Sequence, residues 1–260
     1  ISKINQSSST LKIKMSPVFK VLVDEAFKLN SLSKGLFDPS LSPLINLWGF
    51  GPKGRRNGKP NQAEINATKK LCGMSNFKIS QNLIEKLYSK SELDFSSFAK
   101  GYGVDLVVFY LESIQMDDYF VEIGGEVRTR TSNKVWRVGI EKPDFKEKGR
   151  VSKILKLNGA LATSGDYRNF YSHDGKTYSH GINFDSGRPV ENDIASVSVF
   201  HPISTMRADG WATALMVTDG IQQAKEIIKT NSLAAYIIFR KGNEINIFES
   251  KKWREEFKDD

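Results

Sequence analysis

The segment Tyr119-Phe-Val-Glu-Ile-Gly-Gly-Glu-Val-Arg-Thr-Arg130 decides the fold class, because it holds two short strand patterns separated by a glycine pair. Further strand patterns follow directly, at 135–140, 152–157 and 160–163. The segments with helical spacing lie between such runs of strands rather than alternating with single strands. This order predicts an α+β protein with mixed or antiparallel sheets in meanders and several packing helices, and not a doubly wound parallel sheet.

Caps and apolar spacing predict the helices of the first half. Ser16 and Pro17 begin a helix that carries Val18, Val21, Leu22, Ala26 and Leu29 at helical spacing and stops at Gly35. Asn61 and Glu64 form a capping-box pattern at the start of another. A helix is predicted over 97–113, with five side chains available for burial: Val104, Leu106, Val107, Tyr110 and Leu111. Short strands are predicted at 76–79, 82–88 and 92–95.

Composition excludes several classes of protein. The chain has 260 residues and a net charge of +8, and its 39% hydrophobic and 26% charged residues are typical of a globular protein. Cys72 is the sole cysteine, which rules out internal disulfides and cysteine-cluster metal sites. No apolar run approaches the roughly 20 residues that span a bilayer. The basic residues are spread along the chain, so a nucleic-acid-binding module rests on net charge alone.

Two polar features suggest chemistry. Asp209 and Thr213 are four residues apart in a helical segment, so both side chains lie on one face. A carboxylate and a hydroxyl are hard oxygen donors that suit Mg²⁺, although the same pair also fits a helix-start Asp and a Thr bonded to a backbone carbonyl. His180 follows a predicted strand and precedes a glycine, which fits either a general base or a structural histidine.

A set of motifs in one order resembles the FAD:protein FMN transferase family, the ApbE-type flavin transferases. The matching stretches span nearly the whole chain: Gly35–Pro39, Pro43–Pro52, Leu93–Asp105, Val121–Glu126, Ala162–Asn169, Tyr178–His180, Gly187–Pro189 and Ala208–Thr213. The resemblance implies a single catalytic domain over residues 1–260, with the N-terminal part of the family domain missing. It also implies that the enzyme splits FAD, releases AMP and joins FMN through its phosphate to a threonine hydroxyl of a target protein.

The resemblance also implies a role for each site residue. Asp209 and Thr213 match the metal ligands, and Ser97 matches a position that supplies a further oxygen to Mg²⁺. His180 matches the histidine proposed as base. Six residues match FAD contacts: Leu36, Phe37, Asp38, Asp94, Lys100 and Ile182.

The family also implies partners and a location. Its targets are flavoprotein subunits of membrane redox complexes and extracellular flavin carriers, and its members are extracytoplasmic, often lipoproteins anchored by an N-terminal segment. No nucleic-acid partner is expected, and contact with a membrane is expected only through such an anchor. The chain departs from the family pattern at Gly181, Asn183 and Phe184, and at Ala212, where some members carry another acidic ligand.

Two other functions remain compatible with these residues. An Mg²⁺-dependent FAD pyrophosphatase would use the same metal and diphosphate site with water as the attacking group. A non-catalytic flavin-binding protein is compatible with the changes that follow His180.

Overall fold

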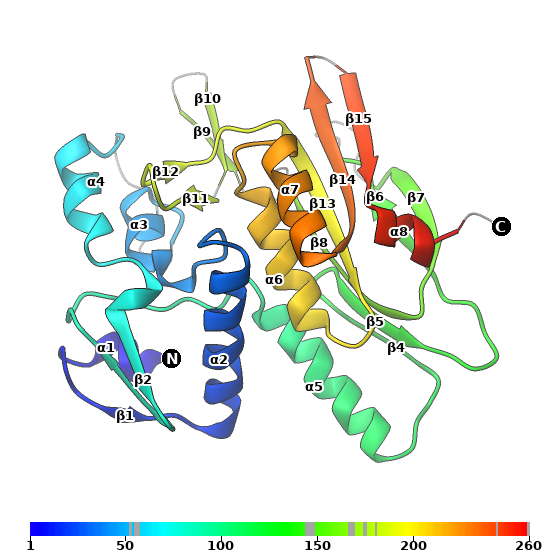
Figure 1. Ribbon diagram of the computed structural model, residues 1–260, viewed down its shortest axis with the longest axis horizontal. Helices are drawn as coiled ribbons and strands as arrows, with labels where there is room; N and C mark the ends of the chain where they lie inside the picture. The colour runs from blue at the N-terminus through cyan, green and yellow to red at the C-terminus, as the bar shows by residue number, and fades with distance from the viewer. Residues whose placement is uncertain are drawn as a thin grey trace. The chain divides into compact units, whose positions relative to one another are not determined.

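The computed structural model describes residues 1–51, 54, 58–143, 149–165, 170–173, 176–179, 181–242 and 244–258, with 170–173 and 176–179 as backbone alone. These residues form two compact units (Figure 1). The first unit comprises Ile1–Phe95 and Tyr178–Val190, and the second comprises Ser96–Thr177 and Glu191–Asp260. The expectation of one catalytic domain over residues 1–260 stays a prediction.

The first unit combines short helices with small antiparallel sheets. Its elements are α1 (Ser2–Gln6), β1 (Ile13–Lys14), α2 (Pro17–Leu32), the 3-10 helix η1 (Pro39–Leu41), α3 (Ser42–Leu47), α4 (Gln62–Lys69), η2 (Met74–Asn76), β2 (Phe77–Ser80), β3 (Leu83–Lys86), β11 (Ile182–Asn183) and β12 (Arg188–Pro189). Strands β1, β3 and β2 pair in that order, and β11 pairs with β12. Both predicted caps are present: the Ser16 hydroxyl accepts the Phe19 N–H, and Asn61 and Glu64 form a capping box.

The second unit contains the larger sheet. Its elements are α5 (Ala99–Ser113), β4 (Tyr119–Ile123), β5 (Glu126–Arg130), β6 (Arg137–Glu141), β7 (Val151–Lys156), β8 (Gly159–Gly165), β9 (Phe170–His173), β13 (Ile194–His201), α6 (Thr205–Met216), α7 (Ile221–Asn231), β14 (Ala234–Lys241), β15 (Glu244–Glu249) and α8 (Lys251–Glu256). Strand β10 (Lys176–Ser179) begins in this unit, and its last two residues are assigned to the first. In the described part of the chain, six strands pair antiparallel in the order β15-β14-β13-β8-β5-β4. The predicted α+β class, with antiparallel meanders, is confirmed.

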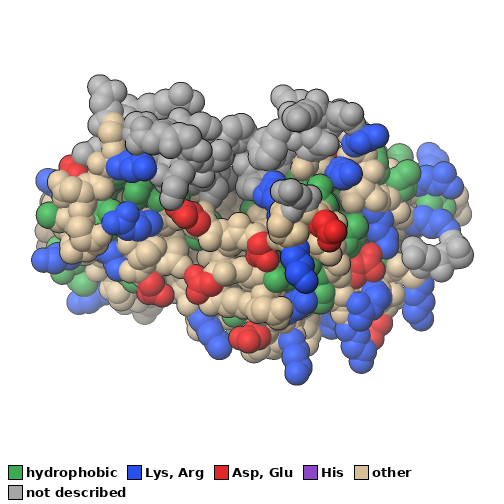
Figure 2. All heavy atoms as spheres, turned by 90° about the horizontal axis from the view of Figure 1, so that it is seen from above, with side chains coloured by type: hydrophobic (Ala, Val, Ile, Leu, Met, Phe, Trp, Pro, Cys, Tyr) green, Lys and Arg blue, Asp and Glu red, His purple; other side chains and the backbone are tan. Residues whose placement is uncertain are grey.

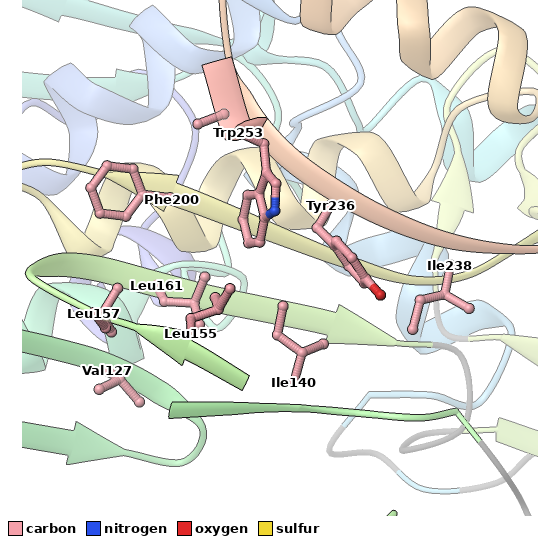
Figure 3. Packing of buried hydrophobic residues seen from close by; sticks show 10 residues of the cluster. Val127, Ile140, Leu155, Leu157, Leu161, Phe200, Tyr236, Ile238 and Trp253 are labelled. Atoms are coloured by element: carbon pink, nitrogen blue, oxygen red, sulfur yellow. The ribbon is translucent and has the colours of Figure 1, made fainter. Parts of the chain in front are cut away.

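Two packing arrangements on this sheet matter for the site. Helices α5 and α6 pack against each other, with α6 also on β13 and β8 and α5 on β4 and β5. Val127, Leu161 and Phe200 are register partners across β5, β8 and β13, so they form one apolar row. Figure 3 shows this row together with Tyr236 and Trp253, whose rings also point into the cluster. Helices α5 and α6 therefore pack on a sheet that has an apolar cluster of its own.

Three sequence predictions are wrong in detail. Residues 92–95 form no strand, because Leu93 and Asp94 donate their N–H groups to the Asn5 side chain and the Pro39 carbonyl rather than to a strand ladder. Val18 and Val21 are exposed on α2, whose buried side chains include Val23 instead.

The third difference concerns α5, where burial was expected along most of the apolar face. Val104 is buried, but Leu106, Val107 and Tyr110 are exposed and Leu111 is half-buried. The apolar residues of α5 occur on all sides of the helix, so their spacing does not indicate which side packs on the sheet.

The distribution of surface charge and the length and polarity of the helices concern the partners of the protein. On the face drawn in Figure 2, lysine and arginine side chains are spread across the described surface and lie among acidic ones. Within the described ranges, no helix is both long and apolar enough to cross a bilayer.

Candidate functional site

Helix α6 carries the two predicted metal ligands one turn apart. The helix begins at Thr205 because the Ser204 hydroxyl caps it, accepting the Arg207 N–H at 3.2 Å. Asp209 is buried and Thr213 is half-buried. Their spacing of four residues places both side chains on the same face of the helix, as the sequence predicts.

The segment that enters α5 meets this face of α6. The Thr213 hydroxyl donates to the Ser97 carbonyl oxygen at 3.1 Å. The Gly101 N–H donates to Asp209 Oδ2, also at 3.1 Å. The structure therefore brings together a carboxylate, a hydroxyl and a backbone carbonyl from the three residues predicted as metal ligands.

Gly101 is what allows the two helices to approach so closely. A Cβ added at this position would lie 2.5 Å from the Thr205 carbonyl oxygen and 2.8 Å from the Met206 Cα. Both neighbours are backbone atoms of α6, which cannot rotate away as a side chain can. The absence of a side chain at Gly101 thus brings its N–H within reach of Asp209.

We expect Gly101→Ala to destabilise the protein by about 1–3 kcal/mol, because α5 and α6 must separate to admit the methyl group. Gly103→Ala is the matched control on the same helix, since its Cβ would meet Ile123 Cδ1 at an ordinary 3.4 Å. That variant should be neutral or up to about 1 kcal/mol more stable, as alanine favours helix over glycine. Urea unfolding measures both, and equal effects of the two substitutions would contradict the close-contact explanation.

The Asp209 carboxyl lies in an unusual electrostatic environment. Burial, followed by the negative charge of Glu126, raises its pKa from 3.8 to about 7, against the opposing effects of the Gly101 hydrogen bond and the Lys100 charge. A buried carboxylate of this kind is stabilised in its charged form by a nearby cation. The site is thus one where a bound cation would offset an existing electrostatic cost.

The donors present fit a hard divalent cation. Carboxylate, hydroxyl and carbonyl oxygens are the ligands that Mg²⁺ prefers, and none of the three is a soft donor. In the described part of the chain, no group of three or more His, Cys, Asp or Glu side chains could hold a metal ion. A cation at Asp209 would therefore depend on the hydroxyl and carbonyl oxygens as well, and the Mg²⁺ assignment stays a prediction.

Lys100, the residue before Gly101, forms an ion pair with Glu126. Its Nζ is 2.6 Å from Glu126 Oε2 and 3.4 Å from the Gly124 carbonyl oxygen. The lysine side chain is 45% exposed, whereas that of Glu126 is 1% exposed. Lys100 therefore has a buried anchor and an ammonium group that solvent or an anionic ligand can reach.

Asp105 fixes the start of α6. Its carboxylate accepts the backbone N–H groups of Thr205 and Met206, at 2.8 and 3.1 Å. It also accepts from the Ser204 hydroxyl at 3.0 Å and from Arg128 Nη1 at 3.1 Å. Because Asp105 belongs to α5, these bonds tie the two helices together about one turn away from Asp209.

The predicted FAD contacts of the first unit lie around η1. Asp38 Oδ1 accepts the N–H and the hydroxyl of Ser40, and burial raises the pKa of its carboxyl above 3.8. The Asp94 N–H donates to the Pro39 carbonyl at 2.8 Å, which brings Asp94 to the loop that contains Leu36, Phe37 and Asp38. Their contact with FAD stays a prediction.

The two remaining residues predicted at the site are Ile182 and His180. The Ile182 side chain is 2% exposed and packs in a hydrophobic cluster with Leu44, Trp48 and Ile65, so its side chain serves the core of the first unit. His180 lies outside the described residues. The roles proposed for both stay predictions.

Sequence reasoning missed three charged residues of this region. Glu126, Asp105 and Arg128 are all buried, and each pairs with a group far away in the chain. Glu126 and Asp105 each end a quoted motif, Val121–Glu126 and Leu93–Asp105, so a signal was present. Arg128 showed none, because an arginine in a strand pattern is typical of a solvent-facing position.

Comparisons with known proteins show the family of this chain. The model of the ApbE family matches residues 1–237. The FAD:protein FMN transferase of Vibrio cholerae is 39% identical over 92% of this chain and 72% of its own length.

Solved structures agree as well. The flavin transferase ApbE from Vibrio cholerae matches with a TM-score of 0.89 and 36% identity, over 98% of this chain and 82% of that one. The Pseudomonas stutzeri flavinyl transferase ApbE in its apo form matches with a TM-score of 0.88 and 36% identity, over 98% and 79%. The chain belongs to the ApbE family.

Proposed function

We propose that this chain transfers FMN from FAD to a threonine hydroxyl of a target protein, with Mg²⁺ held by Asp209, Thr213 and the Ser97 carbonyl. FMN transfer from FAD to a protein is the activity that the curated relatives carry in their names. The observation that carries the metal assignment is the hydrogen bond from the Thr213 hydroxyl to the Ser97 carbonyl, with Asp209 one turn before Thr213 on α6.

The donors and their surroundings suit phosphoryl transfer. When bound, Mg²⁺ neutralises phosphate charge and holds the phosphates for in-line attack. Asp209 contributes the one full negative charge among the three donors, and its burial excludes competing water. The Lys100 ammonium, anchored by Glu126, adds a positive charge close to the same carboxylate.

The proposed group transfer conserves atoms and electrons. The acceptor hydroxyl oxygen forms a bond with the FMN phosphorus, and the bond from that phosphorus to the bridging oxygen breaks. The bridging oxygen leaves with AMP and keeps the electron pair. We assign His180 as the base that takes the hydroxyl proton, since an imidazole titrates near neutrality.

We expect His180→Ala to slow transfer by about 100-fold or more, because general-base catalysis contributes 10²–10⁴. FAD affinity should change little, since the residue acts on the acceptor. Single-turnover flavinylation measures the first quantity and FAD fluorescence titration the second. A normal transfer rate would exclude His180 as the base, and a rate loss matched by lost FAD binding would make it a binding residue.

The transferase reaction can be tested with FAD, Mg²⁺ and a flavoprotein acceptor domain. We expect a fluorescent acceptor band in a denaturing gel. One molecule of AMP should be released for each acceptor molecule that is labelled. The matched control is the acceptor with its target threonine replaced by alanine, which should stay dark. AMP with free FMN and no labelled band would instead indicate a pyrophosphatase, no turnover would indicate a flavin-binding protein, and full labelling in EDTA would contradict the metal assignment.

The acceptor class and the location are proposed on the family resemblance. We assign the acceptor to flavoprotein subunits of redox complexes or flavin carriers outside the cytoplasm, and the protein to the same compartment, as a membrane-anchored lipoprotein. Fractionation of cells that express the protein tests the location, and recovery in the cytosol would contradict it.

A further inference from the structure

Glu126 is a buried carboxylate whose position is set by a tight turn. It begins β5 and pairs in register with Ile123 at the end of β4. The two residues between them, Gly124 and Gly125, have φ angles of 63° and 100°, a backbone conformation that glycine adopts without strain. The short turn leaves little freedom for the Glu126 backbone, so its side chain is presented at a fixed place.

The same turn receives Lys100. The ammonium lies 2.6 Å from Glu126 Oε2 and 3.4 Å from the Gly124 carbonyl. A Cβ at Gly124 would lie 3.1 Å from Lys100 Cδ, so the glycine makes room for the lysine stem. Lys100 is therefore held along the turn by its ion pair with Glu126 and by the space that Gly124 leaves for its side chain.

Lys100 also precedes a residue that bonds to Asp209. Its neighbour Gly101 donates a hydrogen bond to the Asp209 carboxylate. The Lys100 ammonium is 2.6 Å from Glu126 Oε2, and the N–H of the next residue is 3.1 Å from Asp209 Oδ2. The first turn of α5 thus contacts two buried carboxylates, and the lysine pairs with Glu126.

We propose that Glu126 is a positioning residue of the transfer site, which holds the Lys100 ammonium at the turn and so keeps Asp209 available for the metal ion. This inference rests on the proposed function. Without the Glu126 charge, Lys100 turns to Asp209 and competes with the cation for that carboxylate. Glu126 also contributes a second negative charge to the surroundings of the cation.

The test measures metal binding without turnover. Free Mn²⁺, followed by its electron paramagnetic resonance signal, reports the dissociation constant of the ion for each variant. We expect Glu126→Gln to weaken Mn²⁺ binding by about 10- to 100-fold, the range found for groups that orient or tune metal ligands. Glu226→Gln, an equal charge change at an exposed position of α7, should leave the affinity unchanged.

A double variant separates positioning from a general loss of structure. In Glu126→Gln combined with Lys100→Met, the competing ammonium is gone, so we expect Mn²⁺ affinity to recover most of what Glu126→Gln alone loses. A double variant that binds Mn²⁺ no better than Glu126→Gln alone would overturn the inference, because competition by Lys100 would then not be the cause of the loss. Thermal unfolding of each variant confirms that all are folded.

The outcomes distinguish this inference from the proposed function. Failure of the wild-type protein to bind Mn²⁺ at Asp209 would overturn the metal assignment and the inference with it. Normal Mn²⁺ binding by both the wild-type protein and Glu126→Gln would overturn the inference alone and leave the transferase assignment standing.

Discussion

Asp209→Asn will reduce Mg²⁺-dependent FMN transfer by at least about 100-fold, because it removes the one charged donor of the proposed metal site. The variant should fold normally. The asparagine oxygen can still accept the Gly101 N–H, and a neutral amide replaces a buried carboxylate whose charged form burial disfavours. The substitution is therefore expected to separate metal binding from folding.

Thermal unfolding with and without Mg²⁺ measures that separation. The wild-type protein should gain stability from the ion, by an amount that rises with the logarithm of the Mg²⁺ concentration above the dissociation constant, and Asp209→Asn should gain none. Asp219→Asn, an exposed change just beyond the end of α6, serves as the control and should keep both activity and the Mg²⁺-dependent shift. Full transfer activity in Asp209→Asn would refute the metal assignment.

Asp105→Ala is expected to cost about 3–5 kcal/mol of stability, a larger effect on folding than that of Gly101→Ala. The change removes the acceptor of two backbone N–H groups at the start of α6. It also takes from the buried Arg128 guanidinium its shorter carboxylate contact, at 3.1 Å. Loss of one partner from a buried ion pair is costly because the remaining charge is left desolvated.

Urea unfolding of purified variants checks this prediction. Asp105→Asn is the conservative comparison, since it retains an acceptor for the helix start but not the charge opposite Arg128. We expect its loss of stability to fall between those of the wild-type protein and Asp105→Ala. A cost of less than about 1 kcal/mol for Asp105→Ala would mean that the cap and ion pair contribute no more than an ordinary helix cap.

The local elements of this protein were largely predictable, because their signals are contained in a few neighbouring residues. The capping box of Asn61 and Glu64 is an example, since both partners lie within one turn. The strand expected at 92–95 failed for the opposite reason. Its backbone groups bond to Asn5 and Pro39, and no local pattern reveals such distant partners.

In the candidate site, too, local features were predictable from the sequence and distant pairings were not. The shared face of Asp209 and Thr213 follows from helical spacing alone. The Ser97 contribution is a backbone carbonyl, which has no side-chain signal, so it came from the family resemblance. The pairing of Lys100 with Glu126 joins a helix to a strand across 26 residues and required the structure.

A divalent cation held by α6 and the entry to α5 is the central claim, and anomalous diffraction tests it most directly. In crystals grown with Mn²⁺ and FAD, we predict an anomalous peak about 2.1 Å from the Asp209 carboxylate, the Thr213 hydroxyl and the Ser97 carbonyl oxygen, a typical distance for Mg²⁺-like coordination. Density for bound FAD with no such peak, or with a peak at other residues, would contradict the claim.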